Sequence, residues 1–200
     1  MNEVIARSIE QAPNAARSEG LSKEGFIENI EAIRKRARQH IERGAVTESY
    51  KADRNIVISL LNDALATELV CVLRYKRHYF MASGIDAEPA AAEFLEHAKE
   101  EQAHADTLAA RIVQLGGEPD FSPERLADRS HAEYVAGSSL YEMMKEDLVA
   151  ERIAIDTYGQ IVRYIGDDDP TTRRMLEEIL ASEEEHADDL ASMLEGMEKQ

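Results

Sequence analysis

The chain has 200 residues, 44% of them hydrophobic and 32% charged, and its 23 Lys and Arg against 40 Asp and Glu give a formal net charge of −17. This length suffices for one domain with a sizeable core, and the composition is that of a globular chain rather than a disordered one. The single cysteine, Cys71, excludes an internal disulfide and a multi-cysteine zinc or iron–sulfur site, and no apolar run has the length of a membrane span.

Charge is unevenly distributed along the chain. Residues 1–50 carry 8 basic and 8 acidic side chains, so residues 51–200 carry the whole −17. An acidic body attracts cations, whereas phosphate contacts need clustered cationic side chains, so we do not expect DNA as a partner. The first residues lack the apolar segment of a secretory signal. We therefore expect a cytoplasmic protein that binds no membrane.

The first quarter of the chain, residues 1–50, predicts a helical extension ahead of the main domain. Residues 1–18 have a weak helical pattern, and residues 22–43 predict an amphipathic helix that Ser22 caps and Gly44 follows. Its apolar residues recur at three- and four-residue steps and form one stripe. Such a stripe must dock on another surface. Its own domain or a sister subunit is expected, with a partner protein, a membrane surface or DNA as the alternatives.

The main domain, residues 51–200, contains four long helical patterns. They run over about 54–82, 88–115, 138–165 and 170–197. Asp169 followed by Pro170 is a strong start signal for the last of them. Connections of about five residues join the first to the second and the third to the fourth, whereas about twenty residues join the second to the third. We predict an all-α fold, a four-helix bundle with one long crossover.

The two predicted hairpins repeat each other at an offset of 82–83 residues. Each carries a glutamate on its first helix, a tyrosine seven residues later, and a Glu-x-x-His motif on its second helix. The matched residues are Glu68 with Glu151, Tyr75 with Tyr158, Glu101 with Glu183, and His104 with His186.

Helical spacing places these glutamates and histidines on the apolar faces of the four helices. Four carboxylates and two imidazoles would thus point into one core, and burying unpaired carboxylates costs several kcal/mol each. Two divalent cations balance the four negative charges, and each receives one nitrogen ligand. The alternative is a hydrogen-bonded network without metal. A single Glu-x-x-His is a weak signal, but two copies in register predict a two-metal site.

This arrangement resembles the ferritin-like di-iron carboxylate proteins over about residues 55–195, and most of all bacterioferritins and Dps-like proteins with a bacterioferritin-type site. The resemblance implies that Glu101 and Glu183 bridge two irons. It makes Glu68, Glu151, His104 and His186 terminal ligands, and Tyr75 an electron donor close to the site. It also implies that Glu100 and Ser182 orient the opposite histidines. Ser182 departs here from the usual aspartate.

Two further departures concern haem and assembly. Gln102 stands where bacterioferritins have the methionine that binds haem, so we expect no haem of that kind. Only 14 residues follow His186, too few for the fifth helix of a 24-subunit shell. We therefore favour a homo-oligomeric cage of 12 subunits, with 24 subunits or a dimer as alternatives.

The resemblance implies a ferroxidase that oxidises Fe(II) with peroxide or dioxygen at two iron sites per subunit and stores the product in a cage. Manganese suits the same ligands. One alternative is a non-storing di-iron or di-manganese oxidase or peroxidase, similar to rubrerythrin or manganese catalase. The other is a protective DNA-binding cage, which only the basic residues at 34–43 favour.

Five further residues have side chains that can bind metal or titrate. Cys71 is expected to be a small buried core residue, with a position near the metals as the alternative. His97 is expected to be a solvated or core histidine, with an auxiliary iron ligand as the alternative. No role is predicted for His40, His78 or His131.

Overall fold

The computed structural model describes residues 30–84 and 87–198, which form two compact units, one up to Ile41 and one from Glu42. The helix predicted over residues 1–18, and residues 22–29 of the next one, lie outside the described residues. In the first unit, α2 (Ile30–Arg36) ends seven residues before the predicted end at 43. The backbone of His40 takes a positive φ of 50°, which an α-helix does not allow. The predicted end of this helix was therefore wrong.

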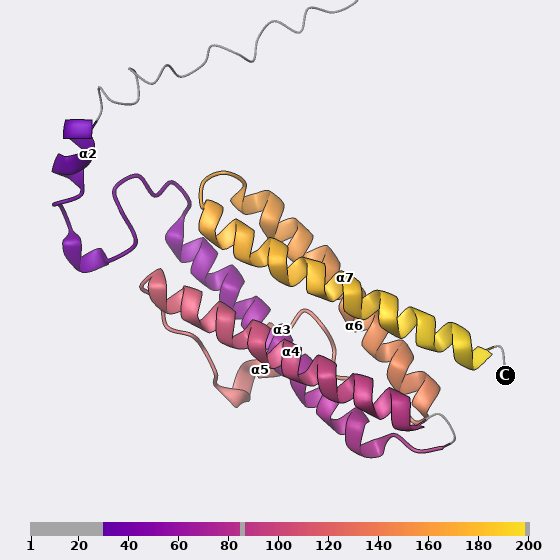
Figure 1. Ribbon diagram of the computed structural model, residues 1–200. Coiled ribbons are helices and arrows are strands. Elements are labelled where there is room, and N and C mark those ends of the chain that lie inside the picture. Colours follow the sequence, from indigo (N-terminus) through magenta and orange to yellow (C-terminus); the bar gives the residue numbers. More distant parts are fainter. Residues whose placement is uncertain (1–29, 85–86, 199–200) are drawn as a thin grey trace, which may run out of the picture. The chain divides into compact units, whose positions relative to one another are not determined.

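Four long helices make up the second unit (Figure 1): α3 (Arg54–Met81), α4 (Ala87–Gln114), α6 (Leu140–Ile165) and α7 (Pro170–Glu198). Each begins and ends within two residues of the prediction. Asp169 accepts a hydrogen bond from the Thr172 backbone N–H at 2.9 Å, as an N-cap does. Gly166 follows α6 with a φ of 52°, which favours glycine. Among the described residues there is no strand, so the predicted all-α class is confirmed.

Helix α3 packs along α4, and α6 packs along α7 (Figure 1). The connection between these hairpins lies against α3 and contains two short helices that were not predicted, η2 (Pro123–Arg125) and α5 (Leu126–Arg129). A hydrogen bond holds this connection to α3, since the His131 backbone N–H donates to Thr67 Oγ1 at 2.9 Å. The predicted single-crossover bundle is therefore the observed fold.

The segment before α3 belongs to the bundle. A short helix, η1 (Ile41–Arg43), precedes it, and Val46, Tyr50 and Ala52 pack against the core. The Tyr50 hydroxyl donates to Asp169 Oδ2 at 3.0 Å, and this carboxylate also binds Arg111. The compact unit therefore starts before residue 51, where sequence patterns alone placed the boundary.

Two apolar layers form the core, and every long helix contributes to both. One layer contains Leu61, Leu108, Ile161 and Leu176, among others, and the second contains Tyr75, Phe94, Met144 and Leu190, among others. Along each helix the change from one layer to the other falls at a glutamate. A band of carboxylates is therefore enclosed between two apolar layers.

A buried charged group ties the crossover to α3 and α6. Asp147 is 0% exposed, and its two oxygens lie 2.7 Å from Arg74 Nε and 2.7 Å from His78 Nδ1. Arg74 also donates to the Glu133 carbonyl, and His78 Nε2 lies 3.0 Å from the Ala136 carbonyl. His78, for which the sequence predicted no role, thus has a structural one.

Helix α3 is also apolar and long enough to cross a membrane by length and composition. However, 56% of its most apolar 18-residue window is buried inside the bundle. The buried Glu68 lies on the same helix. These are features of the core helix of a bundle.

Candidate metal centre

The structure brings together all six side chains that the repeat singled out. Glu68 comes from α3, Glu101 and His104 from α4, Glu151 from α6, and Glu183 and His186 from α7. The four glutamates are at most 2% exposed, as is His186. His104 is the most accessible of the six, at 13% of its side chain.

The ligand atoms fall into two overlapping groups. Glu68, Glu101, His104 and Glu183 form one group, and Glu101, Glu151, Glu183 and His186 form the other, each with ligand atoms within 4.8 Å of one another. Glu101 and Glu183 belong to both. His104 Nδ1 lies 3.0 Å from Glu183 Oε1, and His186 Nδ1 lies 3.6 Å from Glu183 Oε2. One carboxylate thus reaches both histidines.

Several of these buried atoms lack a hydrogen-bond partner in the part of the chain that the structure describes. They are Glu101 Oε1, Glu151 Oε2, both oxygens of Glu183, and His186 Nδ1. Buried polar atoms are almost always paired, so each exception requires an explanation. Carboxylate oxygens and imidazole nitrogens are the ligands that iron and manganese bind. The donor set therefore fits two divalent cations.

The protonation of the metal-free site shows the cost of this arrangement. Burial and the Glu101 charge raise the pKa of Glu68 to about 8, and burial raises the pKa of Glu151 well above its usual value. Burial alone would lower the pKa of the His104 ring, but hydrogen bonds to Glu101 and other carboxylates raise it to about 12. In the metal-free site, protons on Glu68, Glu151 and His104 thus reduce the repulsion between the carboxylates. Metal binding must release these protons.

Two buried tyrosines bind the terminal glutamates across the hairpins. The Tyr75 hydroxyl of α3 donates to Glu151 Oε1 of α6, and the Tyr158 hydroxyl of α6 donates to Glu68 Oε1 of α3. Burial is the main cause that raises the pKa of both phenols well above the usual value for tyrosine, and the charge of the bound glutamate is the second. Only Tyr75 was predicted at the site. The sequence repeat contained the signal for Tyr158.

The two histidines differ in what holds them. His186 Nε2 lies 2.7 Å from Glu100 Oε2, as the resemblance implied. Ser182, the counterpart of Glu100, makes no hydrogen bond to His104 within the described ranges. A carboxylate behind a ligating histidine orients the ring and makes it more basic. The two metal positions are therefore inequivalent in this respect.

Replacing Ser182 with Asp should remove this difference. The new carboxylate would orient His104, and we expect S182D to bind the ion at the His104 position about 10-fold more tightly. Calorimetric titration of metal-free protein with Co²⁺ measures this, with Glu184→Asp on the exposed face of α7 as control. A Co²⁺ binding isotherm of S182D that equals that of the wild type would contradict the proposed difference between the two metal positions.

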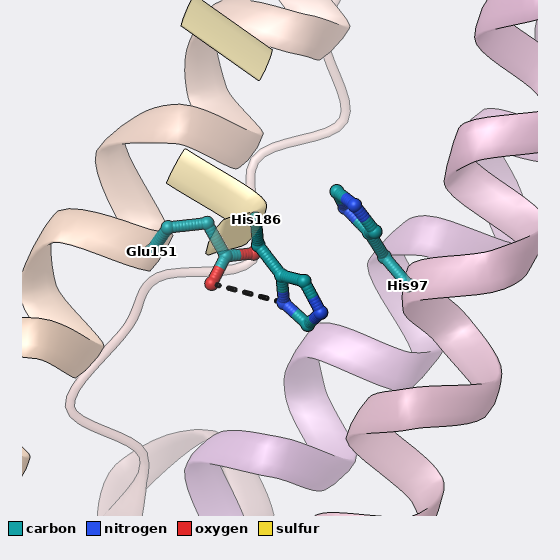
Figure 2. A group of neighbouring side chains, drawn as sticks. All are labelled: His97, Glu151 and His186. Atoms are coloured by element: carbon teal, nitrogen blue, oxygen red, sulfur yellow. Dashed lines mark ion pairs between the residues drawn. The ribbon is translucent and has the colours of Figure 1, made fainter. Parts of the chain in front are cut away.

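His97 lies beside the centre without belonging to the six predicted ligands. Figure 2 shows it extending from its own helix toward His186, with Glu151 on the far side of that ring. The His97 and His186 rings stack at 4.1 Å, and His97 Nδ1 lies 3.2 Å from the Tyr75 hydroxyl. Burial, and next the charge of His186, lowers the pKa of His97 to about 3. Cys71 is also buried, and its Sγ lies 3.6 Å from Arg74 Nη2.

Gln102 lies on the exposed face of α4, where its Nε2 donates to Asp106 at 3.1 Å. The expectation that no haem binds there stays a prediction.

Comparison with known protein families gives one match, to the ferritin-like domain over residues 58–199. Among curated proteins, the bacterioferritin of Mycobacterium tuberculosis is 31% identical over 144 residues, which cover 72% of this chain and 86% of that protein. The bacterioferritin of Desulfovibrio desulfuricans is 30% identical over 131 residues, 65% of this chain and 69% of that protein.

Two solved structures are similar in fold and sequence. A dodecameric thioferritin of Bacteroides fragilis, described as bacterioferritin-related, superposes with a TM-score of 0.72 at 30% identity, covering 74% of this chain and 90% of that one. The D. desulfuricans bacterioferritin, a protein with a di-iron site, gives 0.65 at 26% identity, covering 73% and 82%. A Dps from Thermosynechococcus elongatus, at 21% identity and a TM-score of 0.68, shares the fold.

Proposed function

The chain belongs to the ferritin-like domain family, and from this premise we propose that it is a ferroxidase that oxidises Fe(II) for iron storage and detoxification. The observation that carries the proposal is the pair of ligand groups sharing Glu101 and Glu183, whose buried oxygens lack other partners. Two Fe(II) ions held side by side supply one electron each to dioxygen or peroxide. Relatives that are named bacterioferritins support iron as the substrate.

In this proposal each side chain has a distinct task. Glu101 and Glu183 hold the two ions together, and Glu68 with His104 and Glu151 with His186 complete the two sets of ligands. The four carboxylates neutralise the two ions inside an apolar core. Tyr75 donates a hydrogen bond to Glu151 and is the nearby electron donor. Manganese fits the same donors, so the choice between metals belongs to experiment.

We further propose that the chain forms a homo-oligomeric cage in the cytoplasm, with 12 subunits favoured. The similarity to a dodecameric protein at a TM-score of 0.72 supports this number. The acidic excess of residues 51–200 gives such a cage a surface that attracts iron.

Iron titration of the metal-free protein tests the proposal. With dioxygen or peroxide present, oxidation should continue well beyond two Fe(II) per chain, and the Fe(III) should stay soluble in a large particle that light scattering detects. Uptake that stops at two ions per chain would instead indicate a non-storing oxidase or peroxidase. A chain that does not accelerate oxidation would contradict the ferroxidase proposal.

A further inference from the structure

A groove of about 490 Å³ is open on the bundle where α3 lies beside α6, and we call it the open groove. Ile56 and Leu60 of α3, Ile161 and Tyr164 of α6, and His131 of the crossover belong to its lining. Ile56 is 43% exposed and Tyr164 is 56% exposed, so apolar surface faces solvent here. The volume is within the range of ligand-binding pockets, and no lysine, arginine, aspartate or glutamate lines the groove.

The internal repeat relates the open groove to a second place on the bundle. The repeat pairs each residue of α3 with the residue of α6 that lies 83 positions later. The reciprocal hydrogen bonds of Tyr75 with Glu151 and of Tyr158 with Glu68 show the same pairing in space. Four residues of the open groove therefore have counterparts on the other half of the bundle, and all four counterparts line one cavity. They are Arg77 for Gln160, Met81 for Tyr164, Ser139 for Ile56 and Met143 for Leu60.

The crossover occupies this second place, which we call the filled groove. Only about 170 Å³ of the filled groove stays open. The crossover residues 133–137 are not helical there, and two of their carbonyls accept hydrogen bonds from α3. Arg74 donates to the Glu133 carbonyl at 2.9 Å, and Arg77 donates to the Ala136 carbonyl. The filled groove thus holds a short peptide segment by its backbone.

The open groove has hydrogen-bond donors at the corresponding positions. Thr157 and Gln160 both line it and are the counterparts of Arg74 and Arg77. A threonine hydroxyl and a glutamine amide each donate to carbonyl oxygens. Within the described ranges of the chain, neither of these two side chains makes a hydrogen bond. The spacing of the donors is thus kept while two positive charges are lost, and this favours an uncharged peptide segment.

We propose that the open groove binds a non-helical, uncharged peptide segment of a partner protein, in the way that the filled groove holds residues 133–137. The carbonyls of this segment accept hydrogen bonds from Thr157 and Gln160, and its apolar side chains cover Ile56 and Tyr164. A second copy of the chain offers no such segment among its described residues, because its one crossover occupies its own groove. The segment therefore belongs to a different protein.

Fluorescence polarisation with a labelled peptide tests the proposal on the full-length protein. The probe has the sequence of residues 130–139 with Glu133→Gln, which removes its acidic side chain. We expect saturable binding with a dissociation constant in the micromolar range. In the filled groove, a Cβ on Gly137 would meet the Met143 backbone nitrogen at 2.8 Å, and Leu60 is the counterpart of Met143. The same peptide with Gly137→Val should therefore bind at least about 10-fold more weakly.

Variants of the protein locate the binding. Ile56→Glu and Tyr164→Glu change exposed side chains of the open groove. Each should weaken binding of the probe about 10-fold or more, since the bound peptide buries the new charge. Val149→Glu is the matched control, because Val149 is 44% exposed on α6 and does not line the groove. This variant should bind the probe like the wild type.

Three outcomes would overturn the proposal. A probe that does not saturate at millimolar concentration would show that the open groove holds no peptide. Binding that Ile56→Glu and Tyr164→Glu leave unchanged would place the probe elsewhere on the protein. A wild type that does not bind the probe, together with a smaller particle in Tyr164→Glu by light scattering, would indicate that a second copy covers the groove. None of these measurements involves metal, so the proposed function is tested separately.

Discussion

Glu101→Gln should abolish nearly all protein-dependent Fe(II) oxidation, with a loss of at least about 100-fold in initial rate. Groups that only support a metal ligand typically change metal affinity or activity by about 10- to 100-fold. Glu101 is expected to cost more, because it belongs to both ligand groups and its removal weakens both metal positions. Absorbance of Fe(III) after mixing the metal-free variant with Fe(II) and dioxygen measures the rate.

A stability measurement on the same variant separates lost chemistry from lost folding. The amide of glutamine has nearly the size of the carboxylate but no charge. Burial and the Glu183 charge act to raise the pKa of Glu101, but hydrogen bonds with Glu68, His104 and His186 outweigh them and lower it below its usual value. Metal-free Glu101→Gln should therefore unfold cooperatively at a temperature somewhat below that of the wild type, while the rise in melting temperature caused by Co²⁺ disappears. Glu183→Gln should behave in the same way, and Glu184→Gln, exposed on α7, should behave like the wild type. A variant that keeps its oxidation rate would contradict the assignment of Glu101.

Asp147→Ala should lower the free energy of unfolding by about 3–5 kcal/mol, the range for removing one partner of a buried ion pair. Asp147 is 0% exposed and is the shared partner of Arg74 and His78, so the substitution leaves a guanidinium that is 1% exposed without its carboxylate. Burial by itself opposes the charge of Arg74, whereas its neighbours Cys71 and Asp147 raise its pKa. The ring of His78 loses its partner in the same step.

Urea denaturation of the metal-free protein measures this loss, with Asp156→Ala, at an exposed position on the same helix, as the matched control. The double variant Arg74→Met with Asp147→Leu should recover most of the stability, since well-packed apolar side chains often replace a buried ion pair at little cost. A change below about 1 kcal/mol in Asp147→Ala would be the value for a surface pair and would contradict the structural role.

The sequence alone predicted much of the fold because the relevant signals are local. An Asp169–Pro170 start and glycines after helix ends delimit helices through backbone conformation, which a few adjacent residues determine. The internal repeat then indicated which glutamates and histidines share a face. The spacing of an α-helix converts sequence position into direction, so a Glu-x-x-His motif needs no tertiary information to be placed on one side. The internal repeat also indicated Tyr158, which was identified as the counterpart of Tyr75 but not as a site residue.

Contacts between distant segments were decided only by the tertiary structure. The pairing of Asp147 with Arg74 and His78, and the position of His97 between Tyr75 and Glu93, depend on the rotation and register of one helix against another. No periodicity within a single helix contains that information. The same holds for Tyr50, whose bond to Asp169 attaches the segment before α3 to the bundle. Local spacing thus determined which side chains face inward, whereas packing of the four helices determined which of them meet.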